Sequence, residues 1–299
     1  MFLTKEVNVL SLNSVIRKTF KGGVHPNDHK SHTKHLKIED LPAPKKMIFP
    51  ISQHIGAPSE PVVSVGDAVK VGQLIAKQGG FVSANQHSSV SGIVTDIAPR
   101  LHPNGSMVTS IIIENDEKYE LFEGIPSAKT VDELSPKEII QAVSDAGIVG
   151  MGGATFPTHV KLSPPPDKKI DTVIINGAEC EPYLTSDYRV MLEDTEVLLT
   201  GCGVLVKALG ASRCVIAVES NKKEAISTIQ ENILYHKSSI SVIEVETKYP
   251  QGSEKQIISV VTGREVPPGG LPADVGVVVI NIDTCAAIAR AITTGMPLI

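Results

Sequence analysis

The feature that most constrains the fold is an alternation of strand-like and helix-like segments across residues 171–292. Short runs rich in Val and Ile predict buried strands, and longer segments with apolar residues at helical spacing lie between them. The predicted strands are residues 171–176, 214–218, 241–245 and 275–280, and the predicted helices are residues 185–209, 221–235, 254–261 and 283–292. This alternation predicts a Rossmann-like α/β fold, with a mostly parallel sheet flanked by helices and ligands at the strand ends.

Residues 47–123 carry a different pattern, in which short apolar runs are separated by Gly, Pro, Asp and Asn. Residues 65–76 and 88–94 resemble the two halves of a lipoyl/biotinyl carrier domain. A carrier holds its modifiable lysine at the hairpin before the second half. Here that hairpin reads Ala84-Asn85-Gln86-His87-Ser88-Ser89. We therefore expect an all-β barrel-sandwich domain that lacks the carrier lysine and has a structural role.

A polar connection at residues 116–135 separates these two regions. Ser135 then stands as a helix N-cap, with Pro136 at the first helical position and Glu138 at the capping-box position. The apolar residues that follow have helical spacing and stop at Gly147. The domain boundary is therefore expected within this connection.

Residues 1–46 are rich in Lys, Arg and His, and their one specific feature is the turn Phe20-Lys-Gly-Gly-Val-His-Pro26. Histidines at positions 25, 29, 32 and 35 would gather if this stretch were helical, but Pro26 interrupts it and no carboxylates complete a metal shell. A solvated or partner-facing arm is the favoured interpretation. The predicted division is an arm at 1–46, a barrel-sandwich domain at 47–123 and an α/β domain at 124–299.

The amino-acid composition indicates a globular protein and argues against several other classes. A hydrophobic content of 41% and a charged content of 20% are typical of a soluble globular protein. A net charge of -5, 4% aromatic residues and the lack of Trp argue against nucleic-acid binding. The sequence has neither an apolar run of membrane-spanning length nor a secretion signal, so we expect a cytoplasmic location. The cysteines have no C-x-x-C spacing, which predicts reduced, buried thiols.

A glycine-rich stretch runs from Gly147 to Lys161. Glycines permit positive φ and let a ligand approach the peptide N–H groups, so the stretch predicts a phosphate site. Pro157 is placed to begin a helix whose positive end faces the same anion, and Lys161 would add a charge. A plain connecting loop is the alternative, because the stretch matches neither the P-loop nor the G-x-G-x-x-G pattern.

Two further loops follow predicted strands and are dense in polar groups. They read Asn176-Gly-Ala-Glu-Cys-Glu-Pro-Tyr183 and Asn281-Ile-Asp-Thr284. Any one of these residues alone is more simply a capping residue. Three such loops at one edge of a sheet indicate a binding site.

The loops together resemble a known family. Gly150-Met-Gly-Gly-Ala-Thr-Phe-Pro-Thr158, Asn176-Gly-Ala-Glu-Cys-Glu-Pro182, Tyr249-Pro-Gln-Gly-Ser-Glu254 and Asn281-Ile-Asp-Thr284 are similar, in that order, to the FMN- and NADH-binding motifs of the 51 kDa flavoprotein subunit of respiratory complex I. With the arm and the lysine-less barrel, nearly the whole chain resembles the RnfC family. These are subunits of ion-translocating ferredoxin:NAD oxidoreductase (Rnf) complexes.

This resemblance implies a set of binding residues. FMN would contact Gly150, Gly152, Gly153, Ala154, Thr155, Lys161, Asn176, Asn281 and Thr284, and NADH would contact Glu179, Glu181, Tyr183 and Glu254. The related Gly-Glu-Glu-Thr motif has two acids, whereas this chain has Gly252-Ser253-Glu254-Lys255 and lacks the first. Cys180 would lie near the flavin, where a thiol tunes the flavin, is oxidised, or merely packs; packing is favoured.

The resemblance also implies an oxidoreductase and translocase subunit that passes electrons between NAD(H), FMN and iron–sulfur clusters. Two [4Fe–4S] clusters are expected only in a C-terminal region that this sequence lacks, since it stops at Ile299 with no cysteine-rich run. This fragment would then be only partly active. Expected partners are the other Rnf subunits and ferredoxin, and the expected location is the cytoplasmic face of the cell membrane.

Two alternatives remain at this point. One is a flavin-dependent cobalamin reductase subunit of a propanediol-utilisation compartment, which shares the flavin loop and the barrel. The other is a non-catalytic docking module whose glycine loop holds no cofactor.

Overall fold

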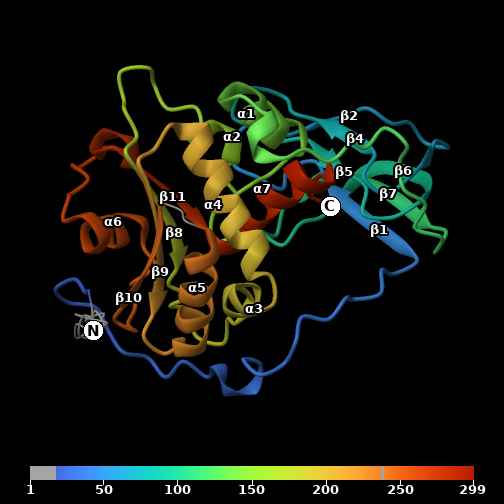
Figure 1. Cartoon of the computed structure of the whole chain (residues 1–299). Coiled ribbons are helices and arrows are strands. Elements are labelled where there is room, and N and C mark those ends of the chain that lie inside the picture. The colour runs from blue at the N-terminus through green and yellow to red at the C-terminus, as the bar shows by residue number, and fades with distance from the viewer. Residues whose placement is uncertain (1–17, 237–238) are drawn as a thin grey trace, which may run out of the picture.

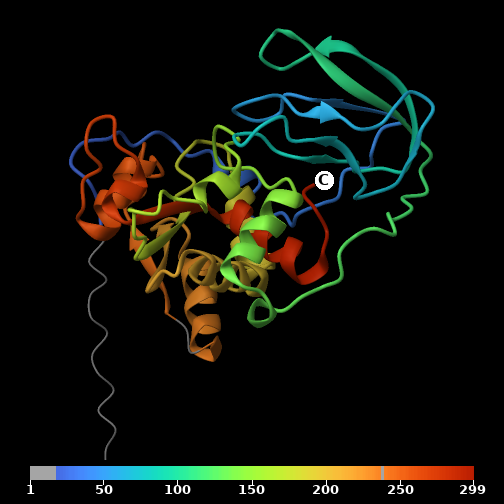
Figure 2. The same ribbon diagram turned by 90° about the horizontal axis from the view of Figure 1, so that it is seen from above.

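The computed structural model describes residues 18–236 and 239–299, which form an α/β part and an all-β part (Figures 1 and 2). The α/β strands are β8 (Thr172–Gly177), β9 (Arg213–Glu219), β10 (Ile240–Val245) and β11 (Val277–Asn281). The helices are α1 (Pro136–Asp145), α2 (Thr158–Lys161), α3 (Ser186–Glu193), α4 (Thr195–Leu209), α5 (Lys223–His236), α6 (Glu254–Thr262) and α7 (Ile282–Thr294). Short 3-10 helices are η1 (Lys30–His32), η2 (Val131–Glu133) and η3 (Pro272–Val275).

The α/β sheet is parallel throughout, with the strand order β10-β9-β8-β11. Successive side chains of a strand point to opposite faces. Val173 and Ile175 therefore pack into the core formed with α1, α4, α5 and α7, while Ile174 packs into a smaller core with α6. The strands β8, β9 and β11 are buried on both faces, as is typical of a parallel sheet, and the edge strand β10 is partly exposed. This architecture confirms the predicted α/β class and brings the carboxyl ends of the strands to one edge.

The helix predicted at residues 185–209 is wrong as a single element, because α3 and α4 meet at Asp194. The backbone of Asp194 leaves the helical region, at φ -124° and ψ 33°, while its N–H still bonds Val190 and its C=O still accepts from Leu198. Its carboxylate accepts a hydrogen bond from Arg290 of α7 at 2.5 Å. A contact between residues so far apart leaves no signal in local periodicity.

The all-β part contains β1 (Lys46–Pro50), β2 (Glu60–Pro61), β3 (Ala68–Val69), β4 (Leu74–Lys77), β5 (Gln86–His87), β6 (Gly92–Leu101) and β7 (Met107–Asn115). They form the sheets β1-β7-β6-β3 and β2-β4-β5, whose pairs are antiparallel. Ile75, Val94, Ile111 and Ile113 fill the core between them. This is the expected barrel-sandwich class, although the short β5 falls in the hairpin that the sequence left without a strand.

The hairpin that would hold a carrier lysine packs against the α/β part (Figure 2). Asn85 Nδ2 donates to the carbonyl of Asp145 at 3.2 Å, and His159 Nε2 lies 3.0 Å from the carbonyl oxygen of Phe81. Gly147 has φ 67°, and a Cβ there would lie 2.3 Å from the Asn85 carbonyl oxygen. The hairpin therefore contacts the start of the glycine-rich loop.

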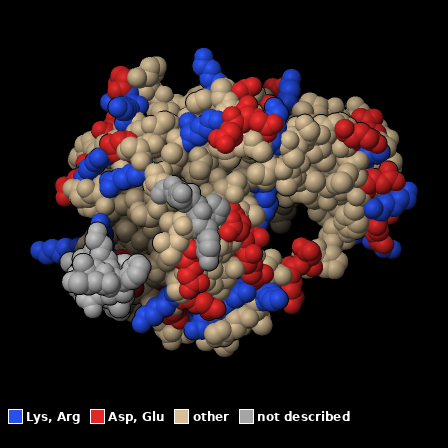
Figure 3. Space-filling view, viewed as in Figure 1, with Lys and Arg blue, Asp and Glu red and all other residues tan. Residues whose placement is uncertain are grey.

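The N-terminal arm is mostly exposed, as a solvated arm would be, but it also contacts its own chain. It passes along the carboxyl edge of the α/β sheet (blue in Figure 1). Lys18 pairs with Val245 and Val24 pairs with Tyr249 as isolated bridges, and Lys30 is 5% exposed. Acidic and basic side chains are interspersed over the face shown in Figure 3, as the modest net charge leads one to expect.

Candidate functional site

A pocket of about 330 Å³ opens at the carboxyl ends of the parallel strands. Six of the predicted site residues line it, namely Gly152, Gly153, Asn176, Glu179, Glu181 and Asn281. Asp187 and Asp283, which were not predicted, line it as well. The remaining predicted site residues are not part of this lining. The structure thus brings together three loops that are widely separated in sequence.

The glycine loop presents backbone amides that the protein itself does not use. Gly150 N donates to Phe156 O and Met151 N donates to Thr284 Oγ1, both at 2.9 Å. The amides of residues 152–156 donate to no partner within residues 18–236 and 239–299. A run of unpaired amides at a pocket fits a bound anion such as a phosphate group.

Of the glycines in this stretch, Gly147 has the predicted positive φ, at 67°. Gly150, Gly152 and Gly153 do not adopt positive φ, whereas Thr155 does, at φ 51°. At Gly152 a Cβ would lie 2.6 Å from Asn281 Nδ2, so close approach of the loop to the end of β11 requires glycine. A Cβ at Gly153 would meet no atom within 4 Å, so that position is open.

The helix predicted to begin at Pro157 has only one turn. Pro157 is the residue before α2, and α2 ends at Lys161, so a strong helix dipole is absent here. Lys161 Nζ donates to Glu254 Oε1 at 2.8 Å and to the Val279 carbonyl at 3.3 Å. A predicted FMN residue and a predicted NADH residue are therefore paired with each other.

The two strand-end asparagines both cap local structure and line the pocket. Asn176 Nδ2 donates to the carbonyl of Gly252 at 2.8 Å, and its Oδ1 accepts from the Ala178 amide. Asn281 Oδ1 caps α7, and its Nδ2 donates to Asp187 Oδ2 at 2.8 Å. Each side chain therefore fixes the loop beside it.

One wall of the pocket is acidic. Glu179 is 3% exposed, and its Oε1 accepts a hydrogen bond from the Asp187 amide at 2.9 Å. Burial, followed by the nearby charges of Glu179 and Asp283, raises the pKa of Asp187 to about 7. Burial also raises the pKa of Glu179 and of Asp283. Near neutral pH Asp187 therefore keeps its proton for part of the time, whereas an exposed aspartate would be ionised.

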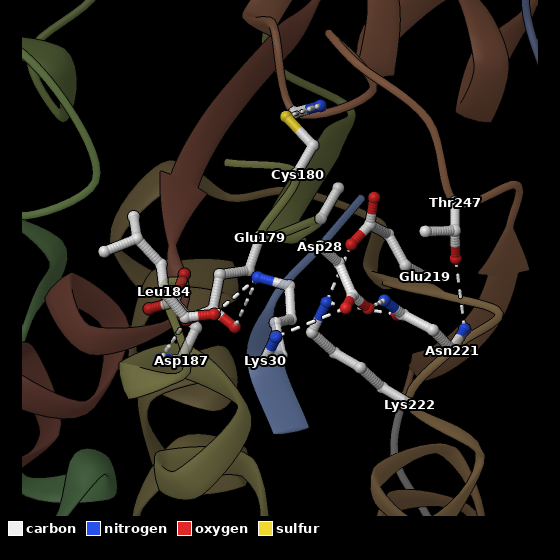
Figure 4. A network of polar contacts seen from close by, with 12 residues as sticks. Asp28, Lys30, Glu179, Cys180, Leu184, Asp187, Glu219, Asn221, Lys222 and Thr247 are labelled. Carbon is white, nitrogen blue, oxygen red and sulfur yellow. Dashed lines mark hydrogen bonds and ion pairs between the residues drawn. The ribbon is translucent and has the colours of Figure 1, made fainter. Parts of the chain in front are cut away.

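Two lysines compensate the buried acids (Figure 4). Lys222 Nζ lies 2.7 Å from Glu219 Oε2, and the side chains are 3% and 0% exposed. Lys30 Nζ, from the arm, lies 3.8 Å from Glu179 Oε2. Glu219 is the last residue of β9, as Asn281 is of β11, so a search for polar residues at strand ends would have found it. No sequence signal distinguished Lys30 or Lys222 from other lysines.

Tyr183 and Cys180 lie outside the pocket lining. Tyr183 is 64% exposed and stacks on His29 of the arm, with ring centroids 4.8 Å apart. Cys180 Sγ accepts a hydrogen bond from Gly252 N at 3.4 Å, and burial raises the pKa of its thiol. All four cysteines are free; Cys202, Cys214 and Cys285 are fully buried and Cys180 is half-buried.

Two kinds of feature are absent from the described residues 18–236 and 239–299. They contain no helix that is long and apolar enough to span a membrane. They also contain no group of three or more His, Cys, Asp or Glu side chains arranged to hold a metal ion.

Family models match both parts of the chain. A model of the Nuo51 FMN-binding domain matches residues 143–290, and a model of the RnfC barrel sandwich hybrid domain matches residues 18–118. The two family models therefore cover both parts of the fold. A chain of an NAD⁺-reducing [NiFe]-hydrogenase is similar over 56% of this chain and 33% of its own, at 25% identity and a TM-score of 0.49.

Curated relatives match nearly the whole chain. One subunit of the proton-translocating ferredoxin:NAD(+) oxidoreductase complex of Clostridium ljungdahlii is 52% identical, and its counterpart in the Na(+)-translocating complex of Acetobacterium woodii is 46% identical. The counterpart in the ion-translocating oxidoreductase complex of Rhodobacter capsulatus is 43% identical. Each match covers 94% of this chain, which spans 61%, 63% and 54% of these relatives in turn. The chain therefore belongs to the RnfC family of electron-transport complex subunits.

Proposed function

We propose that this chain binds FMN in the pocket at the strand ends and exchanges electrons between that FMN and NAD(H), as part of an Rnf-type ferredoxin:NAD oxidoreductase complex. The observation that carries the proposal is the run of unpaired amides at residues 152–156 beside the pocket. The match to an FMN-binding domain model supports it.

The charges of the pocket favour one orientation for FMN. A phosphate is stabilised by unpaired amides and repelled by carboxylates, so it belongs on residues 152–156 and away from Glu179. Asn281 and Thr284 hold the glycine loop in place. Asn176 holds the loop at residues 249–253, here called the Gly252 loop. Lys161 would reach the phosphate only by leaving Glu254, because the two form an ion pair.

The acidic loop, defined as residues 176–184, is assigned to bind the nicotinamide nucleotide. Glu179 and Glu181 line the pocket, and Tyr183 lies between the lining residues Glu181 and Leu184. Glu254 begins α6 directly after the Gly252 loop, which is also part of the lining. When bound, FMN supplies the ability to take up a hydride and release its electrons singly. The protein supplies position and charge around it.

The activity of the whole complex extends beyond this chain. We assign residues 47–123 to a barrel-sandwich domain and residues 124–299 to the nucleotide-binding domain. Two [4Fe–4S] clusters are assigned to the part of the relatives that this chain does not span. Other Rnf subunits and ferredoxin are the proposed partners, on the cytoplasmic face of the membrane. The curated relatives favour this function over a cobalamin reductase.

The proposal is tested by titrating the purified chain with FMN and following flavin fluorescence. A Cβ at Gly153 would meet no atom within 4 Å, so this position can accept a leucine, which would cover the neighbouring amides. We expect Gly153→Leu to weaken FMN binding by about tenfold or more, the equivalent of losing one charge-assisted hydrogen bond.

Gly203→Leu is the matched control, since Gly203 is equally open but lies in α4, away from the pocket lining. It should bind FMN as the unaltered chain does, and both variants should keep their melting temperature. An unaltered chain that neither quenches FMN fluorescence nor gains thermal stability at saturating FMN would rule out the flavin site. It would favour a docking module.

A further inference from the structure

We propose that the N-terminal arm is a built-in part of the nucleotide site. The segment from Phe20 to Lys30, here called the strap, holds two pocket loops in position, and Lys30 is a positioning residue for the acidic loop. This inference rests on the proposed function for its nucleotide readout, but its contacts stand independently of any ligand. It also gives a role to the Phe20–Pro26 turn, which the pocket itself does not explain.

Lys30 binds the backbone of the acidic loop. Its Nζ donates to the carbonyl of Glu181 at 2.9 Å and to the carbonyl of Leu184, two residues that line the pocket. Glu179 Oε2, 3.8 Å away, makes no hydrogen bond within the described chain and has Lys30 as its ion-pair partner. Without Lys30, the two carbonyls would lose a charged donor, and the buried Glu179 carboxylate would lose the cation that lies 3.8 Å away.

The neighbours of Lys30 hold the same loop. The carbonyl of Asp28 accepts from the amide of Tyr183 at 2.8 Å, and the ring of His29 lies parallel to that of Tyr183 within 8°. Tyr183 has φ 70°, which is unfavourable for a residue with a side chain and persists only where neighbouring contacts hold it. The strap supplies those contacts.

The other end of the strap holds the Gly252 loop. Val24 and Tyr249 exchange backbone hydrogen bonds of 2.8 Å. Lys248 Nζ donates to the carbonyls of Phe20 and Gly22 and lies 4.0 Å from the centre of the Phe20 ring. A Cβ at Gly23 would lie 2.8 Å from the Tyr249 carbonyl oxygen, so the paired glycines allow this close approach.

The strap therefore connects two walls of the pocket and leaves the third alone. Within the described residues, Phe20–Lys30 makes no hydrogen bond or ion pair with residues 150–156. A change at Lys30 should move Glu181 and Leu184 but leave the amide cradle intact. Nucleotide binding at the acidic loop and FMN binding at the glycine loop should therefore respond differently, which a purely structural role would not produce.

The test is Lys30→Met in the whole chain loaded with FMN, with NADH added anaerobically and flavin absorbance followed by stopped flow. We expect the apparent Kd for NADH to rise about tenfold, the equivalent of one lost charge-assisted hydrogen bond. The Kd for FMN and the limiting rate of reduction should stay within about threefold. Lys21→Met is the matched control, because Lys21 is an exposed arm lysine whose side chain makes no hydrogen bond or ion pair within the described residues.

A ligand-free readout separates this inference from the proposed function. In the chain without nucleotides, Lys30→Met should speed hydrogen exchange at the Tyr183 amide and leave exchange at Thr158 unchanged. His29→Ala, at the surface, should act in the same direction but more weakly, and it decides the matter if Lys30→Met does not fold. Unchanged Tyr183 exchange in these variants, or equal losses of FMN and NADH binding, would overturn the inference. Failure of the unaltered chain to bind FMN would count against the proposed function alone.

Discussion

The glycine loop and the acidic loop form two walls of the same pocket, and they differ in how their polar groups are satisfied. The amides of residues 152–156 have no hydrogen-bond partner in the described chain, and none of these residues has a charged side chain. The acidic loop holds the buried carboxylate of Glu179, and Lys30 from the distant N-terminal arm lies 3.8 Å from it. One wall is therefore prepared for an anion, and the other is closed to it. This asymmetry orients a ligand that has a phosphate at one end.

The largest expected effect comes from removing the buried lysine that compensates a carboxylate near the acidic wall. Lys222 and Glu219 form an ion pair that is almost fully buried. Lys222→Met would leave the Glu219 carboxylate without it, so the free energy of unfolding should fall by about 3–5 kcal/mol in urea titrations. The exposed neighbour Lys223 is the control, and Lys223→Met should change stability by less than about 0.5 kcal/mol. Equal effects of the two substitutions would contradict this account of the wall.

The next effect concerns the proton on Asp187. Burial, together with the neighbouring charges of Glu179 and Asp283, raises the pKa of this carboxyl from 3.8 to about 7. Between about pH 4 and pH 7 the unfolded carboxyl is ionised while the folded one keeps its proton. The stability of the unaltered chain should therefore fall with rising pH relative to Asp187→Asn. The full difference approaches about 4 kcal/mol above pH 7, at 1.36 kcal/mol per pKa unit.

Urea unfolding of both proteins at several pH values measures that difference and cancels the titration of other groups. Asp187→Asn retains an acceptor for the amide of Asn281, so the local hydrogen bond is preserved. A difference that does not vary between pH 4 and pH 8 would show that Asp187 titrates as an exposed carboxyl.

The smallest effect acts on the glycine loop. Thr284 is 1% exposed, and its hydroxyl accepts the only hydrogen bond that the Met151 amide donates within the described residues. Thr284→Val keeps the shape and removes the acceptor, so stability should fall by about 1 kcal/mol and FMN binding should weaken about fivefold. Thr293→Val in the same helix is the control, since its hydroxyl bonds only the Ala289 carbonyl. Identical FMN affinities for both variants would remove Thr284 from the site.

Much of the fold follows from local sequence. Val and Ile runs between helical segments identified the strands of the parallel sheet, and the polar residues after β8 and β11 located the pocket. The break at Asp194 was missed because it involves Arg290, which is distant in sequence. Lys30 was missed for the same reason, since its partners are about 150 residues away.

The glycine loop shows a subtler limit. The sequence located the unpaired amides and predicted positive φ for the glycine stretch, which Gly147 shows, whereas Gly152 is required by close packing against Asn281. Both causes select glycine, and only coordinates distinguish them. The pairing of Lys161 with Glu254 was equally hidden, because opposite charges from separate motifs carry no mark that they will meet.

The central claim is that backbone amides of the glycine loop hold the phosphate of FMN. Hydrogen exchange of the chain with and without saturating FMN tests it most directly, because it reports on those amides individually. The account predicts that FMN slows exchange at residues 152–156 by about tenfold or more, and slows it far less at Tyr183. FMN that binds while these amides exchange as fast as in the free chain would contradict the account.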